Sequence, residues 1–69
     1  GDYSVSIESH INTLISSYKH MAKLYREGIE VSEKDSDAVT ADIFTGLLND
    51  TEKTLWMLCS TLNKAPELE

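Results

Sequence analysis

Large apolar residues recur along the first part of the chain in steps of three and four. Such steps gather side chains on one face of an α-helix. No proline interrupts the stretch, and its only glycine, Gly28, lies near its end, where it costs little helix stability or loosens the last turn. The pattern predicts a helix over about residues 5–31, with Ser4 or Ser6 as its N-cap. The apolar positions are Ile7, Ile11, Leu14, Ile15, Tyr18, Met21, Ala22, Tyr25 and Ile29.

A second apolar stripe follows a polar connector. Residues 32–37 read Ser-Glu-Lys-Asp-Ser-Asp, and Ser36 or Asp37 is a suitable N-cap for the helix that follows. We expect that helix over about residues 38–63, and Pro66 ends it. A short connector makes the two helices antiparallel neighbours. The apolar face of the second helix comprises Val39, Ile43, Leu47, Leu48, Leu55, Leu58, Cys59 and Leu62.

The second stripe weakens over residues 49–54, Asn-Asp-Thr-Glu-Lys-Thr. Polar side chains surround the helix there for about a turn and a half. This segment is either solvated or meets a polar partner.

The chain of 69 residues is too short for a core that comfortably offsets the conformational entropy of folding. A single cysteine, Cys59, excludes a disulfide framework, and no Cys/His spacing suggests structural zinc. We therefore expect an all-α, antiparallel two-helix hairpin, half of a four-helix bundle completed by a second copy or by a missing half. Aromatic residues at helical spacing indicate a core rather than a cofactor box. The expected packing and oligomer-interface residues are Ile11, Leu14, Tyr18, Met21, Leu47, Leu55, Trp56 and Leu58.

Twelve acidic and six basic side chains give a net charge of -6. Such a chain repels nucleic acid phosphate and anionic lipid headgroups and attracts cations. Its apolar runs are too short to span a bilayer, and its first residues lack the features of a signal peptide. We expect a cytoplasmic protein that binds neither nucleic acid nor membrane, and a chain that is a piece of a longer protein.

Catalytic motifs are missing from the sequence. A di-iron carboxylate site in a helical bundle uses Glu-x-x-His, and no glutamate here has a histidine three residues later. His10 and His20 are about three turns apart and cannot share an ion, so we expect them to be structural or exposed. No phosphate-binding glycine loop or Ser/His/Asp arrangement is present. We therefore assign no catalytic or metal-ligating residue to this chain.

Acidic residues gather around the connector, against only Arg26 and Lys34. One interpretation is a solvated turn whose acids favour the start of the second helix. The other is a cation-attracting opening where several copies meet around a symmetry axis. Composition alone favours the first interpretation. The acidic residues are Glu27, Glu30, Glu33, Asp35, Asp37 and Asp42.

Two segments of the second helix carry a resemblance to a known family. Residues 39–43, Val-Thr-Ala-Asp-Ile, and residues 52–58, Glu-Lys-Thr-Leu-Trp-Met-Leu, resemble the last helix of miniferritins of the Dps family. Residues 24–29, Leu-Tyr-Arg-Glu-Gly-Ile, are similar to the end of the preceding bundle helix. The likeness spans about residues 6–62 and implies the C-terminal half of a ferritin-like bundle, with its last two helices.

The resemblance also implies a function. The complete protein would be a hollow dodecameric shell that oxidises Fe(II), stores ferric iron and limits damage to DNA. The family's ferroxidase ligands are a His on its first helix and an Asp-x-x-x-Glu pair on its second, and neither of these helices is present in this chain. The resemblance places Asp42 at a pore through which iron enters, with Asp37 and Asp35 as neighbours. We expect iron in the complete shell and no cofactor in this chain.

The resemblance leaves one rival hypothesis. The chain could instead be a self-contained helical hairpin that dimerises or binds partner helices. The family's DNA binding often uses a basic tail, which this acidic chain does not show. The length of the encoded protein discriminates between the two hypotheses.

Overall fold

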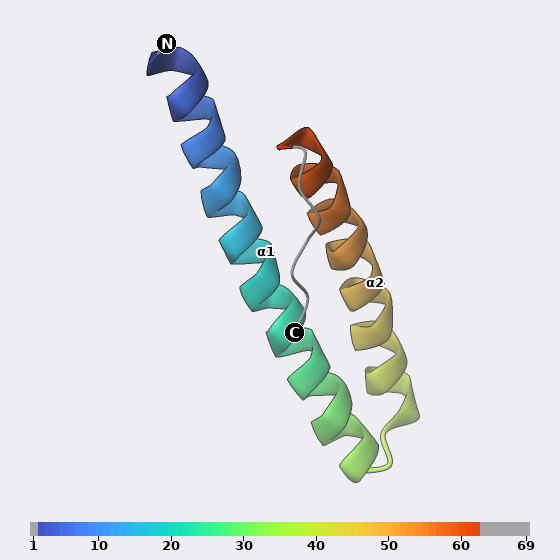
Figure 1. Cartoon of the computed structure of the whole chain (residues 1–69). Coiled ribbons are helices and arrows are strands. Elements are labelled where there is room, and N and C mark those ends of the chain that lie inside the picture. The colour runs from blue at the N-terminus through green and yellow to red at the C-terminus, as the bar shows by residue number, and fades with distance from the viewer. Residues whose placement is uncertain (1, 63–69) are drawn as a thin grey trace.

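Two antiparallel helices joined by a tight turn make up the computed structural model of the chain (Figure 1). The structure describes residues 2–62, with the side chains of residues 5–62. Helix α1 spans Asp2–Lys34 and helix α2 spans Ala38–Thr61. The predicted all-α hairpin is therefore confirmed over this part of the chain.

Helix α1 is longer than the apolar stripe predicts. It begins at Asp2, so the expected caps Ser4 and Ser6 lie inside the helix. The prediction of the N-cap residue is therefore wrong. It also continues three residues beyond the expected end at residue 31. The hydroxyl of Ser32 donates to the carbonyl oxygen of Gly28 at 2.7 Å, which satisfies this polar side chain within the helix. The connector is shortened to residues 35–37.

One residue of the turn, Asp37, forms hydrogen bonds with the end of α1 and with the start of α2. The amide of Asp37 donates to the Ser32 carbonyl at 2.8 Å, and the amide of Ser36 donates to the Glu33 carbonyl at 3.1 Å. This pair of hydrogen bonds is the Schellman motif, and Ser36 takes the left-handed conformation that it requires, with φ 58°. Asp37 is also the N-cap of α2, because its side chain accepts from the amide of Thr40. Of the two predicted caps, Asp37 is the one used.

A small apolar core lies between the helices towards their open end. Ile15, Leu55 and Cys59 are buried, and Leu55 is fully covered. Burying a leucine side chain completely contributes about 1.5–3 kcal/mol to folding. Four half-buried residues complete this cluster: Ile11, Tyr18, Leu58 and Leu62.

Nearer the turn, the helices meet through a close aromatic contact. A Cβ at Gly28 would lie 2.9 Å from two ring atoms of Phe44, so only glycine leaves room for the ring on α1. The ring of Tyr25 lies beside the same phenylalanine, with centroids 6.1 Å apart. Gly28 therefore does not loosen the end of α1, as the sequence suggested it could. It admits an aromatic side chain from α2.

Between the apolar core and the Phe44 contact, the helices meet through a pair of charged side chains, which we call the Arg26–Glu52 crossing. Arg26 Nη2 donates to Glu52 Oε2 at 3.3 Å, with both side chains about one-third exposed. Thr51, beside Glu52, is buried. The polar segment over residues 49–54 thus meets a polar partner in part, which resolves the alternatives left open by the sequence.

The hairpin is elongated rather than compact. Its radius of gyration is 14.8 Å, whereas a compact domain of this length has about 11 Å. Helix α1 has 33 residues and α2 has 24, so the start of α1 projects beyond the end of α2 (Figure 1). Residues 5–10 are all exposed. A single hairpin therefore leaves much of its own surface exposed to solvent.

The Gly28 contact generates a prediction. Alanine in a helix is normally more stable than glycine by about 0.5–1 kcal/mol. At position 28 the added methyl group would meet the Phe44 ring, and overpacking costs about 1–3 kcal/mol. We expect Gly28→Ala to lower the free energy of unfolding by about 1 kcal/mol, measured by urea titration of helical circular dichroism at fixed chain concentration.

The control is the same substitution in a Phe44→Leu chain. The shorter side chain removes part of the clash, so alanine should there be neutral or stabilising relative to glycine. A Gly28→Ala chain that is more stable than the parent, with Phe44 retained, would contradict the close approach.

Candidate functional site

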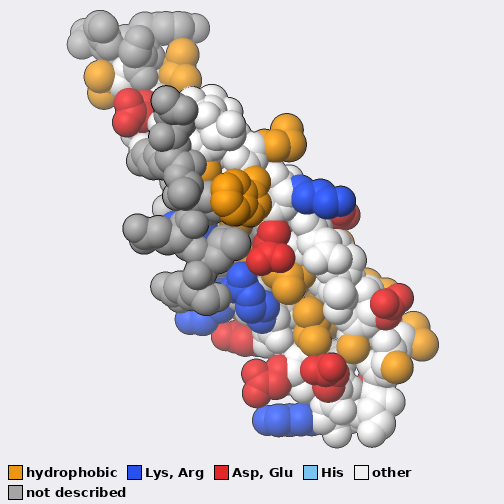
Figure 2. Space-filling view, turned by 45° about the vertical axis from the view of Figure 1, so that its right-hand side comes forward, with side chains coloured by type: hydrophobic (Ala, Val, Ile, Leu, Met, Phe, Trp, Pro, Cys, Tyr) orange, Lys and Arg blue, Asp and Glu red, His pale blue; other side chains and the backbone are white. Residues whose placement is uncertain are grey.

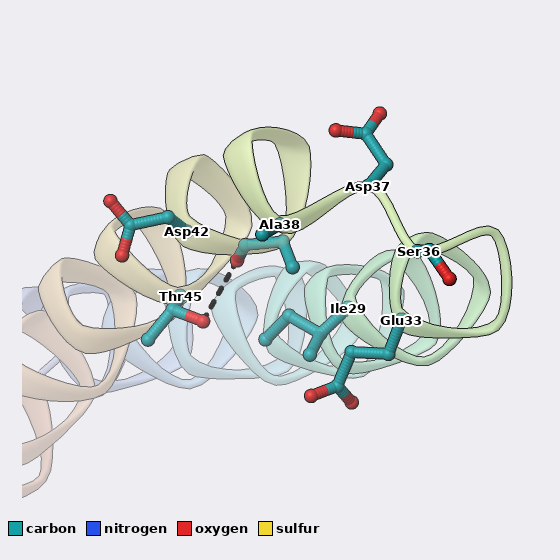
Figure 3. A pocket seen from close by; sticks show the side chains of 8 residues that line it. Ile29, Glu33, Ser36, Asp37, Ala38, Asp42 and Thr45 are labelled. Atoms are coloured by element: carbon teal, nitrogen blue, oxygen red, sulfur yellow. Dashed lines mark hydrogen bonds between the residues drawn. The ribbon is translucent and has the colours of Figure 1, made fainter.

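The turn end of the hairpin carries an open hollow with an acidic rim (Figure 3). Its volume is about 510 Å³. Of the three predicted pore residues, Asp37 and Asp42 line it and Asp35 does not. Glu33 also lines it, although the sequence placed this residue only in the general acidic cluster. The remaining lining residues are Ile29, Ser36, Ala38, Ala41 and Thr45.

The acidic side chains of the hollow do not converge. In Figure 3 the carboxylates of Glu33, Asp37 and Asp42 point in different directions. Nowhere in residues 2–62 do three or more His, Cys, Asp or Glu side chains come together as a possible metal site. Within residues 2–62 these acidic residues are therefore separate negative charges rather than one cluster.

The side chain of Asp37 is held in place by the hydrogen bonds with which it caps α2. Its Oδ2 accepts from the hydroxyl of Thr40 at 2.6 Å, and its Oδ1 accepts from the Thr40 amide at 3.0 Å. These hydrogen bonds, the side-chain bond first, hold the pKa of the Asp37 carboxyl below its ordinary value of 3.8. The carboxylate is thus charged at neutral pH and faces the start of α2, where negative charge is favourable.

The two histidines and the cysteine do not line the hollow. His10 and His20 are exposed on α1, and Cys59 is a buried free thiol in the apolar core. A buried thiol among apolar side chains behaves as a small hydrophobic residue. No helix in residues 2–62 is apolar over a length sufficient to cross a membrane.

The predicted packing residues separate into three groups. Leu55 lies inside the hairpin, with Ile11, Tyr18 and Leu58 packed against its cluster. Leu14 and Met21 are half-buried. Leu47 and Trp56 are 41% and 55% exposed, so the hairpin covers each of them only in part. Apolar spacing alone could not separate these groups, because α2 is apolar on more than one side.

Comparison with known proteins gives consistent relatives. A family model described as "Ferritin-like domain" matches residues 1–68. The DNA protection during starvation protein of Streptococcus suis is 38% identical over 68 residues, which are 99% of this chain and 40% of that protein. The protein of the same name from Agrobacterium fabrum is 40% identical over 52 residues, which are 75% of this chain and 32% of that protein.

A further relative is more distant. DNA protection during starvation protein 2 of Bacillus anthracis is 27% identical over 62 residues, 90% of this chain and 42% of that protein. No solved structure matches the chain significantly. The matched part of the chain thus spans only 32% to 42% of the length of these relatives.

The low pKa of Asp37 generates a second prediction. A carboxyl whose folded pKa is depressed stabilises the fold above its unfolded pKa, and this contribution is lost as the pH falls through the folded pKa. Asp37→Asn keeps a capping oxygen but cannot titrate. We expect the difference in thermal midpoint between the parent and Asp37→Asn to be constant above about pH 5 and to change in favour of Asn below about pH 4.

The measurement is thermal unfolding followed by circular dichroism between neutral and strongly acidic pH. Glu8→Gln, an exposed carboxyl on α1, is the control for general loss of charge. A parent-to-Asn difference that is the same at every pH would show that the Asp37 carboxylate does not stabilise the turn.

Proposed function

Because the chain belongs to the ferritin-like family, we propose that it is the C-terminal helical hairpin of a miniferritin of the Dps type. Three observations support this placement. The family match covers nearly the whole chain, relatives that carry the DNA-protection name extend well beyond it, and the hairpin leaves apolar surface uncovered. In this proposal α1 and α2 are two of the four helices of one bundle.

The activity that we propose for the complete protein is oxidation of Fe(II) and storage of ferric iron, with protection of DNA as the result. Iron is the substrate of that reaction. The hairpin does not carry the oxidation site, since its sequence has neither Glu-x-x-His nor Asp-x-x-x-Glu. Its own contribution is structural: it supplies half of the bundle and presents an acidic end.

The acidic end would act where several copies of the hairpin meet around a symmetry axis. Asp35 and Asp42 are exposed, as is Glu33 on the facing helix. Divergent carboxylates in one hairpin bind no ion strongly, but a ring of them raises the local concentration of cations at an opening. The observation that carries this proposal is the hollow at the turn, lined by Glu33, Asp37 and Asp42.

A second function has one observation in its favour. Exposed Trp56 is a large apolar side chain of the kind that anchors protein interfaces. A stand-alone dimerisation or interaction module would use it to bind another helix. A coding sequence that extends upstream through a His and an Asp-x-x-x-Glu pair would favour the miniferritin, and one limited to these residues would favour the module.

The proposed division of roles predicts no ferroxidase activity for this chain. We expect stopped-flow mixing of Fe(II) and hydrogen peroxide with the 69-residue chain to give the rate of the buffer background. A full-length protein of the Dps type is the positive control. Oxidation clearly above background would place an iron site in this hairpin and contradict the proposal.

The pore proposal predicts an effect on iron entry. In the complete shell, Asp42→Asn should slow iron uptake several-fold while leaving assembly intact, because it removes one carboxylate per copy from the opening. Asp50→Asn, an exposed acid of the same helix farther from the turn, is the matched control. Equal uptake by both variants, measured by formation of ferric mineral, would remove Asp42 from the entry path.

A further inference from the structure

The basic side chains of the hairpin gather away from its acidic turn. Residues 9–26 of α1 contain three of them and no acidic residue, and residues 53–62 of α2 contain one and again no acidic residue. These two stretches run side by side in the antiparallel hairpin (Figure 1). With neutral histidines they carry four positive charges, although the net charge of the whole chain is -6. The four basic residues are Lys19, Lys23, Arg26 and Lys53.

One side of this region combines lysines with an exposed aromatic residue. The Arg26–Glu52 crossing marks this side on each helix. On α1, Lys23 lies one turn before Arg26 and Lys19 two turns before it, within about 60° and 20° of it around the helix axis. On α2, Trp56 lies one turn after Glu52 and within about 40° of it. We call the surface formed by Lys19, Lys23 and Trp56 the basic side. Figure 2 shows blue Lys and Arg side chains at mid-length of the hairpin, with exposed apolar side chains among them.

The groups of the basic side can take a partner. Within residues 5–62 neither Lys19 nor Lys23 forms an ion pair, whereas Arg26 is already paired with Glu52. The side chain of Trp56 is 55% exposed. Lysines attract carboxylates, and an exposed indole gains from contact with an apolar side chain. The partner that fits is therefore a short segment with an apolar residue between acidic ones.

The sequence contains such a segment after α2. Residues 66–69 read Pro-Glu-Leu-Glu and lie outside the described residues, and we call them the acidic segment. An extended chain covers about 3.3 Å per residue, so the first of these glutamates, five residues after Leu62, reaches up to about 17 Å from it. Measured along the helix axes from the Arg26–Glu52 crossing, the residues of the basic side lie about 5–10 Å back from Leu62. The acidic segment is therefore long enough to reach them.

We propose that the acidic segment binds the basic side of its own hairpin. Its two glutamates pair with the two lysines, and Leu68 covers the indole of Trp56. The short connection to Leu62 keeps the segment at an effective concentration of the order of millimolar, so weak contacts suffice to hold it. Bound there, the segment covers Trp56, and a partner helix that uses Trp56 as an anchor must first displace it. The inference does not depend on the iron-storage proposal.

Fluorescence of Trp56 reports the contact directly, because Trp56 is the only tryptophan of the chain. A chain of residues 1–65 lacks the acidic segment, and acrylamide should quench its Trp56 about twofold more efficiently than in the parent. The difference should not change with chain concentration, because the contact is intramolecular. Circular dichroism reports whether the helices persist. Equal quenching in the two helical chains would overturn the binding of the segment, and so would a difference that grows with concentration.

Charge exchange in the full chain tests the ion pairs. Because the segment runs back from Leu62, its first glutamate, Glu67, lies opposite Lys19. Glu67→Lys and Lys19→Glu should each lower the ratio of bound to free segment about fivefold and raise quenching, since each replaces an exposed ion pair by repulsion. The double variant restores opposite charges and should return to the quenching of the parent. Quenching in the double variant that equals or exceeds that of both single variants would overturn this pairing.

Two further variants of the full chain separate the basic side from general effects of charge. Asp50→Lys changes an exposed acid of α2 that lies about 160° around the helix axis from Glu52, and it should leave the quenching of Trp56 unchanged. Leu68→Ser removes the apolar contact and should raise quenching towards that of the shortened chain. An effect of Asp50→Lys as large as that of Glu67→Lys would overturn the basic side as the binding surface.

Discussion

Asp37 is the residue on which the antiparallel arrangement depends. Its backbone amide completes the end of α1, and its side chain caps the start of α2. Helix ends leave backbone groups without partners, and here one residue satisfies groups of both helices. Because no spacer separates the two functions, the helices must reverse direction within residues 35–37. The positions of the core cluster, the Arg26–Glu52 crossing and the Phe44 contact all follow from this reversal.

Much of this fold could be predicted from apolar spacing, because the spacing reports local geometry. It gave two helices, their antiparallel order and Asp37 as one of two caps. It could not reveal Gly28 as a contact site, since that role depends on a ring from the other helix. Nor did it predict Ser36 in the left-handed conformation, which glycine usually adopts. Because no glycine marks the end of α1, apolar spacing predicts that end three residues too early.

The candidate site was less predictable than the fold. The acidic character of the turn is a property of composition, and the family resemblance selected Asp35, Asp37 and Asp42. Which carboxylates share a hollow depends on the turn geometry, which admits Glu33 and leaves out Asp35. Which apolar side chains of α2 are exposed was equally hard to predict. A helix that is apolar on two sides gives one broad signal in the sequence, and only the position of α1 separates the inner face from the outer one.

Because α1 is longer than α2, the local stability of α1 varies along its length. At the turn, its backbone is held by the Schellman hydrogen bonds and by the Phe44 contact. At its other end, residues 5–10 project past α2 and are exposed on all sides. An isolated helical segment of this length is marginal in water, so its order depends on propagation from the packed part. The free energy of local unfolding therefore rises along α1 towards the turn, and the hairpin opens from its projecting end.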